Sequence, residues 1–170
     1  MRAALVRVDR WLRGLTPALL TVLLVLATGL PIGLPGLPSV MPWLALMAVF
    51  YWTLHRPDLL PAGAVFLLGL LQDAISGTAL GFHAALLLAV HWVVLTQRWV
   101  FHRKSFNVVW WGFSLVASGA AVLAWVLGSI LAWRLIDPRL MLVQLALTVA
   151  LYPLVAWASR RAHRTLEEWR

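Results

Sequence analysis

The residue best placed to do chemistry in this sequence is Asp73, which lies in an otherwise apolar segment, FLLGLLQDAISGTALGFHAAL. A carboxylate near hydrocarbon is costly unless it has a partner, a water-filled pocket or an interfacial position. Asp73 could cap a turn together with Ser76 and Gly77. It could instead bind a partner or a small ligand at the membrane interface. A proton relay is the third alternative, although no second acidic residue falls within a predicted membrane span.

Two histidines follow in the next apolar run. His83 and His91 are eight residues apart, which on a helix is about 12 Å along the axis and about 80° around it. One metal ion cannot bridge that separation, and the chain has neither a cysteine nor an HExxH pattern. We therefore predict no metal site. His83 could instead pair with Asp73 across a helical hairpin, which would satisfy both polar groups.

The sequence gives little support for catalysis. A nucleophile needs a base and an orienting group within reach, and the serines stand among small residues. No GxxxxGK[ST] loop is present to bind nucleotide phosphates. We therefore predict no catalytic residue and no cofactor.

Glycines accompany Asp73 at regular intervals. Gly69 precedes it by four residues, while Gly77 and Gly81 follow. Residues without a side chain let membrane helices approach closely, and glycine also permits positive φ in turns. Arg56 and Pro57 lie in a second short turn. This turn could be purely structural, or it could dock a cytoplasmic partner.

The elements that position these residues are apolar helices. Hydrophobic residues make up 62% of the chain, charged residues only 12%, and the mean hydropathy is +0.87. A soluble core cannot absorb that excess, so we predict an all-α, polytopic membrane bundle forming one domain over residues 1–170. The predicted spans cover approximately residues 15–34, 40–54, 59–74, 79–96, 106–133 and 140–158.

The basic residues predict the orientation of this bundle. Of the 14 lysine and arginine residues, only Arg134 and Arg139 would lie on the second side of a six-span arrangement. By the positive-inside rule, both termini are then cytoplasmic. Topology also accounts for the net charge of +8, so we predict no nucleic-acid partner.

The combined pattern resembles the MreD family of bacterial rod shape-determining proteins. The most specific part of the resemblance is Gly69-x-x-x-Asp73-x-x-Ser76-Gly77-x-x-Leu80-Gly81. The other matching motifs are Tyr51-Trp52, Arg56-Pro57, Ala84-Ala85-Leu86, Asp137-Pro138-Arg139, Leu151-Tyr152-Pro153 and Arg160-Arg161.

The resemblance implies a multi-pass protein of the bacterial inner membrane that belongs to the wall-elongation complex and is not an enzyme. Its implied partner is the bitopic scaffold MreC. Through MreC it would connect with the MreB filament, the RodA glycosyltransferase and a penicillin-binding transpeptidase, with lipid as its surroundings. The resemblance also implies a fold similar to the substrate-binding subunits of energy-coupling-factor transporters. A small-molecule transporter subunit of that type is the alternative function, and an intramembrane enzyme is a more distant one.

Overall fold

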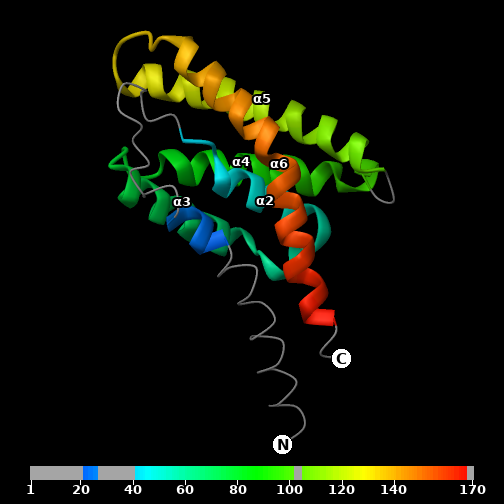
Figure 1. Ribbon diagram of the computed structural model, residues 1–170. Coiled ribbons are helices and arrows are strands. Elements are labelled where there is room, and N and C mark those ends of the chain that lie inside the picture. The colour runs from blue at the N-terminus through cyan, green and yellow to red at the C-terminus, as the bar shows by residue number, and fades with distance from the viewer. Residues whose placement is uncertain (1–20, 27–40, 102–104, 168–170) are drawn as a thin grey trace, which may run out of the picture.

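The computed structural model describes residues 21–26, 41–101 and 105–167, and all regular secondary structure in these ranges is helical (Figure 1). Residues 21–26 form a helical segment within the first predicted span, whose other residues lie outside the described ones. The remaining elements are α2 Leu44–His55, the 3-10 turn η1 Pro57–Leu59, α3 Ala62–Ser76, α4 Phe82–Phe101, α5 Phe106–Leu131 and α6 Pro138–Glu167. The prediction of an all-α fold is confirmed.

Two described helices are long and apolar enough to cross a membrane, namely Phe106–Leu131 and Pro138–Ala158. The apolar helices α2 and α3 contain only 12 and 15 residues. At a rise of 1.5 Å per residue, α2 extends about 18 Å, which is less than the roughly 30 Å of a bilayer core. The six-span arrangement therefore stays a prediction.

Several helix boundaries differ from the predicted ones because local turns displace them. α3 begins at Ala62 rather than near residue 59, since Pro57–Leu59 close a 3-10 turn and Pro61 precedes the first helical residue. α4 begins at Phe82 because the preceding residues form the turn after α3. α6 continues to Glu167, well beyond the expected end of the apolar run.

The short helix α2 forms the centre of the bundle. All nine residues from Ala45 to Thr53 are buried, which fits a helix that is hydrophobic all round. Phe50 packs edge-on against Phe113 of α5 and Tyr152 of α6, with ring centroids 5.1 and 5.8 Å away. Phe113 and Tyr152 stack at 4.0 Å. One aromatic cluster thus joins α2 to the later helices α5 and α6.

Polar groups fix α6 against the start of α2. The backbone N–H of Trp43 donates to Thr148 Oγ1 at 3.1 Å, and Gln144 Nε2 donates to the carbonyl of Met41 at 2.7 Å. The first bond satisfies an N–H at the N-terminal end of α2, where no intrahelical partner is available, and the second holds the chain two residues before Trp43.

Small residues set the packing of α5. The buried small residues of α5 are Ala117, Ala120, Ala121 and Ala124, as expected for a stripe that packs helix against helix.

The following helix, α6, contains Pro153, and Figure 1 shows α6 changing direction between its orange and red portions. A proline inside a helix removes a hydrogen bond and bends the axis.

Candidate functional site

The turn between α3 and α4 is built on a left-handed glycine. Gly77 has φ 65° and ψ 23°, and its N–H donates to the carbonyl of Asp73. The N–H of Thr78 donates to the same carbonyl at 3.2 Å. Gly81 closes the turn with φ 97°. Both glycines adopt a backbone conformation that is strained for residues with a side chain, which explains their type at these positions.

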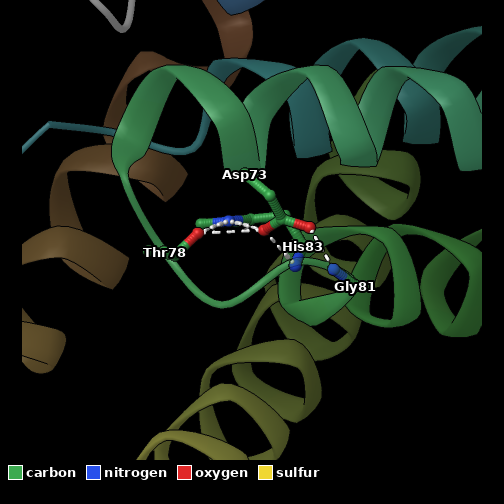
Figure 2. A network of polar contacts seen from close by, with 4 residues as sticks. All are labelled: Asp73, Thr78, Gly81 and His83. Atoms are coloured by element: carbon green, nitrogen blue, oxygen red, sulfur yellow. Dashed lines mark hydrogen bonds and ion pairs between the residues drawn. The ribbon is translucent and has the colours of Figure 1, made fainter.

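The carboxylate of Asp73 lies inside this turn and is fully buried. Its Oδ1 accepts from Thr78 Oγ1 at 2.9 Å, from the His83 backbone N–H at 2.9 Å and from His83 Nδ1 at 2.8 Å (Figure 2). Its Oδ2 accepts from the Gly81 N–H at 2.8 Å. Asp73 thus caps the beginning of α4 from the end of α3, since its backbone donors are the N–H of Gly81, just before α4, and that of His83 in the first turn of α4.

The predicted pairing of Asp73 with His83 is therefore present. An ionised carboxylate has no proton to donate, so the short contact places a hydrogen on His83 Nδ1. In a neutral imidazole, Nε2 is then the unprotonated nitrogen. We refer to Asp73, Thr78, Gly81 and His83 as the hairpin lock.

The contribution of Thr78 was not anticipated from the sequence. Ser76 was expected to help cap the turn, yet its side chain is exposed and forms no hydrogen bond within the described part of the chain. The hydroxyl that reaches Asp73 belongs to Thr78, after the left-handed glycine has reversed the chain. Its position within the turn, five residues after the carboxylate, is the signal that could have identified it.

Gly69 holds the same two helices together one turn earlier in α3. A Cβ at this position would lie 2.3 Å from the Cα and 2.6 Å from the nitrogen of Ala84. Such distances are not possible without moving the backbone of α4. The close approach predicted from the glycine spacing is thus formed between Gly69 and Ala84.

Arg56 and Pro57 lie apart from the hairpin lock. They flank the turn at the opposite end of α3, a helix of 15 residues and hence about 22 Å long. Arg56 is exposed, its N–H donates to the carbonyl of Trp52 at 2.7 Å, and Pro57 begins η1. Arg56 and Asp58 form no ion pair in the described structure. The predicted motif residues therefore divide into two groups.

A buried contact between α2 and α4 was missed by sequence reasoning. Thr53 Oγ1 lies 2.8 Å from His91 Nδ1, and both residues are buried. The sequence offered no signal for this pairing because the two residues are 38 positions apart.

Among the described residues, no group of three or more histidine, cysteine, aspartate or glutamate side chains is placed to hold a metal ion.

Comparison with known proteins adds one finding. The family model described as rod shape-determining protein MreD matches residues 7–160 of the chain. No curated protein and no solved structure is significantly similar to the chain. The matched range includes both groups of motif residues and every described helix up to the basic part of α6.

Proposed function

Because this chain belongs to the MreD family of rod shape-determining proteins, we propose that it is a non-catalytic component of the complex that inserts peptidoglycan along the side wall. MreD proteins are membrane proteins with a role in cell shape. In this proposal the chain organises wall synthesis by binding the membrane helix of an MreC-like bitopic scaffold. Contacts with an MreB-like filament, a RodA-like glycosyltransferase and a penicillin-binding transpeptidase are indirect.

The family match carries this proposal, and the chemistry of the site supports it. The carboxylate of Asp73 and Nδ1 of His83 bond to each other, and the other donors to Asp73 come from the same turn. Such groups hold two helices in register rather than present reactive atoms to a substrate. The transporter alternative has no support among the similar proteins found.

Exposed apolar side chains provide the surface for such a partner. On α5, Trp111, Leu115 and Val122 are 70, 74 and 63% exposed. Contiguous apolar surface of this kind suits lipid or another membrane helix. Because the described connections between helices are short, most of the surface available to a partner lies along the helices themselves.

We further propose a multi-pass arrangement in the inner membrane, with Arg56 on the cytoplasmic side and the hairpin lock on the periplasmic side. The chain contains no cysteine, so single cysteines can report each side. Asp58→Cys should react with a membrane-impermeant maleimide only after the membrane is opened, whereas Ala79→Cys should react in intact spheroplasts. The reverse pattern would contradict this orientation.

The decisive experiment is a pull-down of the tagged chain from its native membrane in a mild detergent, read by mass spectrometry. Recovery of a bitopic periplasmic scaffold with wall-synthesis enzymes is expected. Recovery of an ATPase module with its membrane coupler, and of no wall enzymes, would instead support a transporter subunit.

Variants of the α3–α4 turn make the same experiment specific to the site. Asp73→Asn and Gly77→Leu should reduce recovery of the scaffold and impair rod shape, because both disturb the α3–α4 turn. Asp58→Asn and Gly63→Leu are matched controls, since Asp58 and Gly63 are exposed and nothing lies within 4 Å of a Cβ at Gly63. Normal shape and normal scaffold recovery in both turn variants would show that the motif is not needed for the function.

A further inference from the structure

An apolar groove of about 450 Å³ runs between α5 and α6. Ser118, Val122 and Trp125 line it from α5, and Pro138, Leu142 and Leu145 line it from α6. Its volume falls within the roughly 300–1,000 Å³ that is usual for small-ligand sites. The groove lies outside the hairpin lock, and Val122 is the one lining residue that also belongs to the exposed α5 face described above.

The groove begins beside the loop that joins its two helices. Trp125 forms its wall near that loop and donates from Nε1 to the carbonyl of Ile136 at 2.9 Å. The opposite end is marked by Ser118, seven residues before Trp125 in α5, and by Leu145, seven residues after Pro138 in α6. Seven residues correspond to about 10 Å. A groove of that length would cover about a third of a bilayer core of roughly 30 Å.

Two cations stand at the loop end. Arg139 is exposed and lies three residues before Leu142, so the helical repeat puts it about one turn nearer the loop on a neighbouring face. Arg134 is exposed within the loop. The nearby carboxylate of Asp137 accepts from the backbone N–H of Arg139 at 2.9 Å. Two guanidinium groups against one carboxylate leave this end of the groove positive.

We propose that this groove binds an acyl chain of an anionic phospholipid whose headgroup phosphate contacts Arg139 and Arg134. The polarity of the site matches that of the lipid, because a cationic end lies at the connecting loop and an apolar channel leads toward the middle of the helices. Guanidinium groups bind phosphate oxygens through paired hydrogen bonds. A crossing helix about 10–12 Å in diameter would be expected to contact α5 and α6 over much more of their length.

The absence of native cysteines allows one fluorescent label to be placed in the groove. The full chain carrying Leu142→Cys, labelled with bimane, is reconstituted in phosphatidylcholine vesicles. Bromine-labelled phosphatidylglycerol is then compared with bromine-labelled phosphatidylcholine as a quencher at equal mole fractions. We expect phosphatidylglycerol to be favoured at the label by roughly five-fold for each arginine that contacts it. A label at Leu67→Cys, exposed on α3, should be quenched equally by the two lipids.

Charge variants complete the test. In the labelled protein, the double substitution Arg134→Gln and Arg139→Gln should abolish the preference for phosphatidylglycerol. Arg98→Gln, which removes an exposed arginine of α4, should leave it unchanged. Equal quenching by the two lipids in the parent protein, or an equal loss of preference in Arg98→Gln, would overturn the proposal in favour of ordinary lipid contact or a general charge effect. Failure of this test would leave the pull-down result, and so the proposed function, unaffected.

Discussion

Asp73 and His83 face each other across the α3–α4 turn, with Oδ1 of the carboxylate 2.8 Å from Nδ1 of the imidazole and 2.9 Å from the His83 backbone N–H. One carboxylate oxygen therefore binds both the side chain and the main chain of the same residue. This double contact fixes the start of α4 relative to the end of α3.

Asp73→Asn should destabilise the protein. In the native protein, Oδ2 accepts from the N–H of Gly81. The asparagine amide keeps one acceptor oxygen, but its NH₂ group would take the place of Oδ2 and face that N–H, donor against donor. A buried donor without an acceptor costs about 1–3 kcal/mol. We expect a lower melting temperature in detergent, with unfolding measured by circular dichroism. The exposed residue Asp58 provides the control, and a loss as large in Asp58→Asn would point to a general charge effect.

Gly69→Ala tests the close contact of α3 with α4. The added methyl would overlap the backbone of Ala84, so the two helices must separate at a cost of about 1–3 kcal/mol. Gly63→Ala lies in the same helix with nothing within 4 Å of the new carbon, and it should be neutral or slightly stabilising. Equal melting temperatures for the two variants would contradict the close approach.

Gly77→Ala tests the left-handed cap of α3. No atom lies within 4 Å of the added carbon, so any loss of stability arises from the backbone conformation and not from crowding. A left-handed residue with a Cβ costs about 1–2 kcal/mol. Gly119→Ala, which lies inside α5 and also meets no neighbour, should instead raise stability by up to about 1 kcal/mol. Thermal unfolding of the two proteins in the same detergent checks this opposite pair of signs.

Thr53→Val tests the buried contact between α2 and α4. The substitution keeps the shape of the side chain but leaves Nδ1 of His91 without its partner Oγ1. We expect a loss of about 1–3 kcal/mol. Thr96→Val is the matched control, because Thr96 is exposed and its hydroxyl bonds only to carbonyls of its own helix. If the two variants unfold at the same temperature, the Thr53–His91 bond contributes little to stability.

The sequence by itself determined the helical fold class and the local chemistry of the α3–α4 turn. Its hydrophobic content predicts apolar helices. The residues Gly69, Asp73, Gly77 and Gly81 lie in one short segment, where local backbone geometry largely decides which groups meet. For the same reason the pairing of Asp73 with His83, only ten residues apart, could be predicted. Local reasoning nevertheless chose Ser76 in place of Thr78, because the direction of each hydroxyl depends on the left-handed turn at Gly77.

Only the tertiary structure decided which distant residues meet. Thr53 and His91, or Phe50, Phe113 and Tyr152, come together through the way whole helices pack. In a chain where nearly every helix is apolar, the hydrophobic pattern does not distinguish a face that contacts protein from one that contacts lipid. Packing of side-chain shapes and a few buried hydrogen bonds make that distinction, and both depend on all the helices at once.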